Sequence, residues 1–340
     1  MNLIHQVTTK FKERFSPRGL ILMYHRVAES DLDPWGLSVS PDHFAQQLEV
    51  IKRYFRPMSL RELRKRQKNG KVPNRSITIT FDDGYADNLH AAKPLLEHYD
   101  IPATIFLVTD ALVEERNFWW DELEWALLRP GTLPDRLDLK TNGSLQSWEL
   151  GSASRYSMED RGQDRNRRPW DAAPGTRLAF FYTVWQHLIQ LSKPERLDAL
   201  DEVRTWAGVG ADSRTGDRAL IPAEANELGQ GALVELGAHT VTHASLTTLS
   251  VDRQKEEVSN SKTQLENIIH RPVTSFSYPH GDYSMETLAL VRNAGFDCAC
   301  TTEFKCISRG SDPFQLPRFQ VDDWDGETFL RWLARWYAFS

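Results

Sequence analysis

Two short segments hold the residue types that hydrolytic catalysis most often uses. Residues 80–84 read Thr-Phe-Asp-Asp-Gly and offer two adjacent carboxylates, and residues 239–243 read His-Thr-Val-Thr-His and offer two imidazoles. One aspartate and two histidines form the ligand set of a catalytic zinc site, which leaves positions for water and substrate. A divalent ion lowers the pKa of its bound water towards neutrality, and a second carboxylate can then take the proton. The two segments predict metal-assisted hydrolysis with a water on the metal as nucleophile.

The spacing of the two histidines restricts the backbone between them. In an extended segment His239 and His243 would lie about 13 Å apart, too far to reach one ion. Four residues of helix rise only about 6 Å and turn both rings to one side. The intervening residues, Thr-Val-Thr, are poor helix formers. We therefore expect a single tight turn, and the alternative is two unrelated surface histidines.

The two aspartates directly follow an apolar, alternating stretch, 76–81, which predicts a strand. In a parallel barrel, residues at the carboxyl ends of the strands line the active site. Asp-Gly is also a common turn pair, so an ordinary strand-to-helix turn is the alternative for Asp82 and Asp83. Two adjacent carboxylates repel each other unless a cation shares them, which favours a site.

Strand and helix patterns alternate on both sides of these segments. Predicted strands cover 19–25, 76–81, 103–108, 234–238, 275–278 and 297–301, and predicted helices cover 41–55, 86–99, 251–269, 284–294 and 329–338. Strand, helix and strand at this pitch predict parallel βαβ units. The expected fold class is therefore α/β, as a barrel in which parallel strands alternate with helices.

The alternation stops over about 115–228. This stretch predicts helices at 119–128, 178–191 and 194–206, and a hairpin around Asn142-Gly143. Residues 152–175 are polar and predict a mobile loop. We interpret 115–228 as a mainly helical insertion, a lid or a partner surface, within one domain that covers residues 1–340.

Composition narrows the class of protein. Of the 340 residues, 40% are hydrophobic and 26% are charged, which predicts a soluble chain with a substantial core. The net charge of −6 is dispersed and argues against a nucleic-acid face. The 11 tryptophans suit sugar faces, although most tryptophans are core residues. The three neighbouring cysteines, Cys298, Cys300 and Cys306, are expected to be reduced thiols, with a zinc site as the alternative.

No early apolar run is long enough for a secretory signal or a membrane span, so a cytoplasmic location is expected. Residues 1–15 are weakly amphipathic. An ordinary surface helix is one interpretation, and peripheral contact with a membrane surface is the other. The oligomeric state is left open.

Three segments in this order resemble the polysaccharide deacetylases, the NodB-homology group of carbohydrate esterase family 4. They are 80–84, 239–243 and 276–281, the last of which reads Phe-Ser-Tyr-Pro-His-Gly. The resemblance covers roughly 18–110 and 230–325. It implies a deformed (β/α) barrel of the polysaccharide deacetylase type and removal of acetyl groups from an N-acetylated sugar or glycoconjugate.

The resemblance also assigns roles. The first aspartate of the family's first motif is the general base, which matches Asp82, and the second is a metal ligand, which matches Asp83. The histidines of the second motif are the remaining ligands, which match His239 and His243. The implied cofactor is one divalent metal, with Zn²⁺ expected and Co²⁺ or Ni²⁺ as alternatives.

The third motif departs from the family in one residue. It lines the acetyl pocket and matches Tyr278, Pro279 and His280, with the His280 N–H as oxyanion donor, worth about 3 kcal/mol in the transition state. The family's arginine, which braces the catalytic aspartate, is replaced by Ser277. Arg318 is the candidate substitute, and a surface salt bridge is its alternative.

The second departure concerns the general acid. The family ends with an apolar strand that closes in a histidine, and no such strand follows the third motif here. The stretch 20–25, Leu-Ile-Leu-Met-Tyr-His, resembles that strand moved to the front, as in the circularly permuted relatives that resemble the poly-N-acetylglucosamine deacetylases. His25 would then protonate the leaving amine. A core histidine at a strand end is the alternative, and His280 is the second candidate acid.

Three functions are consistent with these residues. The first is a metal-dependent carbohydrate N-deacetylase, and the second is a hydrolase of another non-peptide amide on the same fold. The third is a catalytically silent carbohydrate-binding relative. Intact Asp82, Asp83, His239 and His243 favour the first. The expected partner is an N-acetylated sugar: nucleotide-linked, lipid-linked or a small glycoside, rather than a mature wall polymer.

Overall fold

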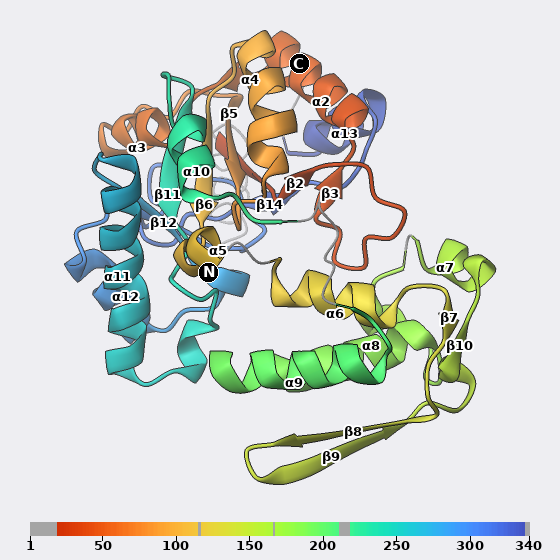
Figure 1. Ribbon diagram of the computed structural model, residues 1–340. Coiled ribbons are helices and arrows are strands. Elements are labelled where there is room, and N and C mark those ends of the chain that lie inside the picture. Colours follow the sequence, from red (N-terminus) through yellow and green to blue (C-terminus); the bar gives the residue numbers. More distant parts are fainter. Residues whose placement is uncertain (1–18, 115–116, 166, 211–217, 337–340) are drawn as a thin grey trace, which may run out of the picture. The chain divides into compact units, whose positions relative to one another are not determined.

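The computed structural model describes residues 19–114, 117–165, 167–210 and 218–336 (Figure 1). The chain divides into two compact units. The first comprises Met1–Glu29, Ser38–Glu114 and Leu220–Ser340, and the second comprises Ser30–Leu37 and Glu115–Ala219. The organisation as a single domain with an insertion stays a prediction. Residues 1–15, for which the sequence suggests either a surface helix or membrane contact, lie outside the described residues.

The first unit is built on a parallel sheet, which confirms the predicted fold class. Its strand order is β13-β12-β11-β6-β5-β1-β14, and β4 also pairs with β5. The strands are β1 (Gly19–Tyr24), β4 (Arg56–Pro57), β5 (Ser76–Phe81), β6 (Ala103–Leu107), β11 (Val234–Ala238), β12 (Ser275–Ser277), β13 (Cys298–Cys300) and β14 (Phe319–Gln320). Leu316 bridges to Cys300 on β13, and β14 then pairs with β1, so one segment touches both ends of the sheet. This arrangement curls the sheet into a deformed barrel.

Helices connect these strands. They are α2 (Pro41–Tyr54), α3 (Leu60–Lys68), the π-helix η1 (Asn88–Ala92), α4 (Lys93–Tyr99), α5 (Thr109–Glu114), α10 (Pro222–Leu228), α11 (Val251–Ile269), α12 (Met285–Asn293) and α13 (Gly326–Ala334). The start of α2 follows from its sequence, because the Ser40 hydroxyl accepts from the His43 N–H and Pro41 takes the first helical position. A short parallel pair, β2 (Arg26–Val27) and β3 (Ser38–Val39), stands apart from the main sheet.

The core of the first unit fixes the strand ends that carry polar residues. All six residues of β1 and all six of β5 are buried, and the two strands pair in register from Gly19–Ser76 to Tyr24–Phe81. The rings of Tyr24 and Phe81 stack at 5.4 Å. Each fully buried side chain of this size contributes about 1.5–3 kcal/mol, so the register of β1 against β5 is strongly set.

The second unit is mainly helical. It contains α6 (Trp119–Leu127), β7 (Gly131–Thr132), β8 (Arg136–Thr141), β9 (Ser144–Glu149), β10 (Arg155–Tyr156), α7 (Met158–Asp164), α8 (Arg177–Leu188) and α9 (Lys193–Trp206). The predicted hairpin is present, as β8 and β9 pair antiparallel across Asn142 and Gly143. The loop predicted at 152–175 is wrong in part, because α7 forms there behind a capping box of Ser157 and Asp160.

Two further sequence expectations can be compared with the structure. All three cysteines are free, and Cys298 and Cys300 are buried on β13. Burial raises the pKa of the Cys300 thiol to about 12, so this thiol is protonated and unreactive. Within the described part of the chain, no helix has the length and apolar character needed to cross a membrane.

Candidate metal centre

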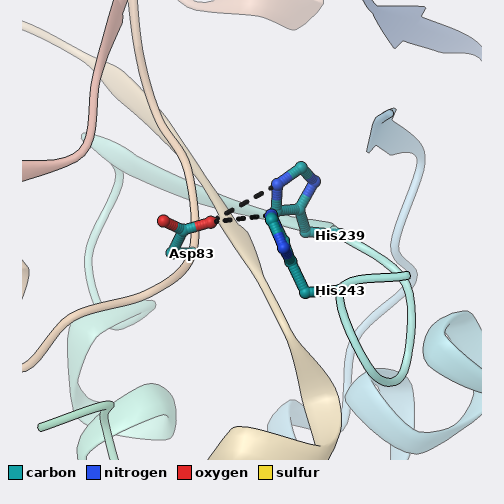
Figure 2. Close-up of side chains that lie close together, drawn as sticks. All are labelled: Asp83, His239 and His243. Carbon is teal, nitrogen blue, oxygen red and sulfur yellow. Dashed lines mark ion pairs between the residues drawn. The ribbon is translucent and has the colours of Figure 1, made fainter. Parts of the chain in front are cut away.

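Three predicted ligands converge at the carboxyl ends of β5 and β11, which lie on the two sides of β6. Asp83 follows β5, and His239 follows β11, which pairs with β6 next to β5. Asp83 Oδ1 lies 3.5 Å from His239 Nε2 and 3.3 Å from His243 Nε2 (Figure 2). The exposed fractions are 4% for Asp83, 1% for His239 and 9% for His243. The sequence therefore brings one carboxylate and two imidazoles into a single buried cluster.

The geometry of this cluster fits a divalent ion. Nitrogen and oxygen ligands that sit 2.0–2.2 Å from one tetrahedral ion are about 3.3–3.6 Å from each other. The separations of 3.5 Å and 3.3 Å from Asp83 Oδ1 match this range. Asp83 Oδ1 is buried and accepts no hydrogen bond among the described residues. A buried carboxylate oxygen without a hydrogen bond is unfavourable unless a cation or a water occupies the position that it faces.

A hydrogen bond fixes the tautomer of His239. Its Nδ1 lies 2.8 Å from the carbonyl oxygen of Ser277, which can only accept, so Nδ1 carries the proton. Nε2 then presents its lone pair towards Asp83 and His243. Ligating histidines are commonly oriented by a carbonyl in this way. The main chain of β12 thus prepares His239 as a ligand.

The backbone of both ligand-bearing segments is left-handed at single residues. Asp83 has φ 74°, Thr240 has φ 65° and His243 has φ 56°. Such conformations cost about 1–3 kcal/mol each and cluster where function requires them. The expected turn between the histidines is therefore non-helical, and the His243 N–H closes it by donating to Thr240 Oγ1 at 3.0 Å. Gly84, with φ 86°, continues the left-handed segment after Asp83.

Asp82 does not join the three-residue cluster but forms a bidentate pair with Arg318. The two guanidinium nitrogens of Arg318 donate to the two Asp82 oxygens at 2.7 Å each. Ser277 Oγ donates to Asp82 Oδ2 at 3.2 Å and accepts from Arg318 at 2.8 Å. Arg318 is fully buried and Asp82 is 3% exposed. The candidate arginine, Arg318, therefore binds Asp82, and the Ser277 hydroxyl is hydrogen-bonded to both side chains.

The centre holds two buried carboxylates, Asp82 and Asp83, and one buried guanidinium, Arg318. Burial acts to raise the pKa of the Asp82 carboxyl, but Arg318, His239 and His25 together lower it below its ordinary value. Burial acts to lower the pKa of His239, but Asp82 and Asp83 outweigh burial and raise it. Arg318 pairs with Asp82, whereas the ion-pair partners of Asp83 among the described residues are the two histidines, His239 and His243, and no lysine or arginine. This balance suits a bound cation.

His25 lies beside Asp82 through strand pairing. Tyr24 pairs with Phe81 at the ends of β1 and β5, and His25 and Asp82 are the residues that follow them. The Asp82 N–H donates to the Tyr24 carbonyl at 3.0 Å. Asn88 Nδ2 donates to the His25 carbonyl at 2.8 Å. His25 is partly buried. Its role as the general acid stays a prediction.

The third motif forms a tight turn, η5 (Pro279–Gly281), next to the histidines. Tyr278 and Pro279 are buried, whereas His280 is exposed with φ 58°. The Gly281 N–H donates to the Tyr278 carbonyl at 2.9 Å. The His280 ring centroid lies 4.7 Å from that of His243. The turn therefore borders the cluster, as an acetyl pocket would require, and the oxyanion role of its N–H stays a prediction.

Sequence reasoning missed two carboxylates that hold the histidine loop. Glu257 on α11 accepts from the N–H groups of Val241 and Thr242, and Asp282 accepts from Ser245 Oγ and from Thr247. Both contacts join residues from different elements. Glu257 differs little from the other charged residues of α11 in the sequence, so no local pattern identified it.

Comparison with known proteins gives a family match. The sequence model of the family described as polysaccharide deacetylase matches residues 69–131 and 191–299, just over half of the chain. A Bacillus subtilis (strain 168) protein named putative polysaccharide deacetylase YxkH is 33% identical over 88 residues, 26% of this chain and 32% of that protein. A Staphylococcus aureus (strain MSSA476) poly-beta-1,6-N-acetyl-D-glucosamine N-deacetylase is 34% identical over 122 residues, 32% of this chain and 41% of that protein. The chain thus spans less than half the length of either curated relative.

Solved structures share the fold. The Streptococcus pyogenes deacetylase PplD, determined in complex with acetate, has a TM-score of 0.56 and 20% identity, covering 93% of this chain and 98% of that one. IcaB from Ammonifex degensii has a TM-score of 0.57 and 16% identity, covering 93% of this chain and 97% of that one. At these identities the likeness concerns the fold.

Proposed function

Because the chain belongs to the polysaccharide deacetylase family, we propose that it hydrolyses the acetamide of an N-acetylated sugar with the help of one divalent metal. The observation that carries the proposal is the buried cluster of Asp83, His239 and His243 beside the Asp82–Arg318 pair. The cluster offers three metal ligands, and the pair offers Asp82 as an ionised carboxylate that is not a ligand. A protein that only binds carbohydrate would need neither of these features.

Asp83, His239 and His243 would hold the metal, with zinc as the expected ion. When bound, such an ion acidifies water and polarises the acetyl carbonyl. The remaining chemistry belongs to the chain. Asp82 takes a proton from the attacking water, and Arg318 keeps the Asp82 carboxylate ionised and oriented through its two hydrogen bonds. A carboxylate with a lowered pKa is a weak base, so it works here only on water that is itself acidified.

The collapse of the tetrahedral species requires an acid and an anion-binding group. We assign His25 as the acid that protonates the leaving amine, because it directly follows β1 as Asp82 directly follows the paired strand β5. His280 is the alternative acid, since its ring lies against His243. The backbone N–H of His280 is the candidate donor to the oxyanion. Such a donor contributes about 3 kcal/mol when it is placed on the developing charge.

The names of the relatives support a polymer of N-acetylated amino sugar as substrate. The test is an acetate-release screen with zinc-loaded protein. Its panel holds β-1,6-linked N-acetylglucosamine oligomers, β-1,4-linked oligomers and a nucleotide-linked N-acetylglucosamine. We expect release from at least one class. Asp82→Asn is the matched variant, which keeps zinc and loses at least about a hundredfold in turnover. No release from any sugar amide, or equal turnover by Asp82→Asn, would contradict the proposal.

A further inference from the structure

The loop between the two histidine ligands cannot hold its own shape. Thr240 and His243 both have left-handed backbone angles, at φ 65° and 56°. Such residues stay in place only when the surrounding structure fixes them. The hydrogen bond from the His243 N–H to Thr240 Oγ1 lies within the loop and does not satisfy the peptide groups of Val241 and Thr242, which need partners from other elements.

Two helices supply those partners: α5 donates to carbonyl groups of the loop, and α11 accepts from its N–H groups. The first two residues of α5 donate to the loop carbonyls: Thr109 N–H to Thr240 at 3.2 Å, and Asp110 N–H to Val241 at 2.9 Å. Glu257 on α11 serves the loop donors. Its Oε2 accepts from the N–H groups of Val241 and Thr242 at 2.9 Å each, and its Oε1 accepts from Thr242 Oγ1 at 2.8 Å.

In the part of the chain that the structure describes, the hydrogen bonds of the Glu257 carboxylate all go to this loop. Among the described residues no lysine, arginine or histidine forms an ion pair with it. Its neighbour Glu256 instead pairs with Arg253 at 2.6 Å on the exposed face of α11. The three groups that donate to this half-buried carboxylate all belong to the histidine-bearing loop, so its place in the structure is to hold that loop. Hydrogen bonds to a charged group are among the stronger ones in proteins, and three of them oppose the strain of two left-handed residues.

We propose that Glu257 is a positioning residue for the metal centre: it holds the loop in the conformation that turns the Nε2 atoms of His239 and His243 to one point. The inference rests on the proposed metal site but assigns no role in the chemistry to Glu257. Partners that orient ligands from outside the ligand set change metal affinity by about 10–100-fold when they are removed.

The experiment measures zinc affinity of the full chain, stripped with chelator, by competition against a chromophoric chelator and without substrate. We expect Glu257→Ala to weaken zinc binding by about 10–100-fold. Glu256→Ala, next to it on the same helix, is the matched control and is expected to bind as wild type does. Glu257→Gln keeps an acceptor for both amides and a partner for Thr242 Oγ1, so its affinity is expected to stay within about threefold of wild type.

A Co²⁺ absorption spectrum provides a second readout, since its shape reports the ligand geometry. We expect an altered spectrum in Glu257→Ala and a wild-type spectrum in Glu257→Gln. If Glu257→Ala fails to fold, Glu257→Asp replaces it, because the shorter side chain keeps the charge but cannot reach all three donors. Zinc affinity in Glu257→Ala or Glu257→Asp within about threefold of wild type would overturn the inference. A wild-type protein that binds no zinc would instead remove the proposed function, so the two failures are distinguishable.

Discussion

At the scale of single residues, the centre contains a buried ion pair between Asp82 and Arg318. The sequence suggests this pair only through the missing arginine of the third motif. Arg318 was expected to replace the missing arginine of the third motif, and it lies on Asp82 with both nitrogens. Ser277, in the position of that arginine, bonds both partners. A guanidinium from Arg318, directly before β14, thus fills the place that the motif leaves open. Neither the bidentate geometry nor the part played by Ser277 could be read from the sequence, because both depend on residues far apart in it.

The Asp82–Arg318 pair yields a prediction about stability. Removing one partner of a buried ion pair leaves an uncompensated charge and costs about 3–5 kcal/mol. We therefore expect Arg318→Met to lower the free energy of unfolding by this amount, and Asp82→Asn to lower it as well. The double variant is expected to be more stable than Arg318→Met alone, because no buried charge is left unpaired. Urea unfolding of the four proteins measures the coupling, and strictly additive losses would contradict the pairing.

His25 yields a prediction about the leaving group. His25→Ala is expected to keep zinc and to lose turnover by about 10²–10⁴-fold on an N-acetylated sugar, as loss of a general acid does. The loss is expected to shrink on an activated aryl acetate, whose leaving group needs no proton. Steady-state rates on both substrates test this. An equal loss on both would assign His25 to structure, and the same comparison would then be made with His280→Ala.

At the scale of elements, the sequence was most informative where local chemistry decides the structure. The predicted bounds of β5, β11 and α11 agree with the structure, because alternation and helical periodicity are local signals. Helix α3 and strand β14 were missed: α3 is strongly charged and β14 has only two residues. The turn at the histidines was expected, but its left-handed residues were not, because they are imposed by contacts with α5 and α11.

Strand β11 yields a prediction about packing. A Cβ added at Gly237 would lie 2.4 Å and 2.6 Å from ring carbons of Phe106 and 2.7 Å from Ser275 Oγ. Gly237→Ala is therefore expected to destabilise the protein by about 1–3 kcal/mol through overpacking. Gly310→Ala is the control, because an added Cβ there meets nothing within 4 Å. Chemical denaturation measures both, and a Gly237→Ala protein as stable as the control would contradict the close approach of β11 and β6.

At the scale of the whole molecule, the chain divides into two compact units. The metal centre lies within the first unit, and the second is organised around a buried arginine. Arg177 is 2% exposed and donates to carbonyls of Leu127, Gly131, Ala153 and Ser154. Burial lowers its pKa to about 10, so it remains charged at neutral pH. One side chain thus accounts for carbonyls from the end of α6, from β7 and from the turn at residues 153–154.

Arg177 yields a prediction that separates the units. Arg177→Met leaves these carbonyls without their donor, and each buried unsatisfied group costs about 1–3 kcal/mol. We expect faster amide hydrogen exchange in α8 and in the segments that carry those carbonyls, with zinc affinity as in wild type. Hydrogen exchange followed by mass spectrometry, together with a zinc titration, tests this. Unchanged exchange in α8 would contradict the structural role of Arg177.

The central claim is that Asp83, His239 and His243 bind one divalent ion. The most direct measurement is the zinc content of chelator-stripped protein after reconstitution and removal of free metal. We expect about one equivalent in wild type and in His90→Ala, an exposed histidine paired with Glu224 outside the cluster, because three protein ligands hold one catalytic zinc. We expect negligible zinc in His239→Ala and in His243→Ala. Equal zinc in wild type and His239→Ala, or none in either, would contradict the account.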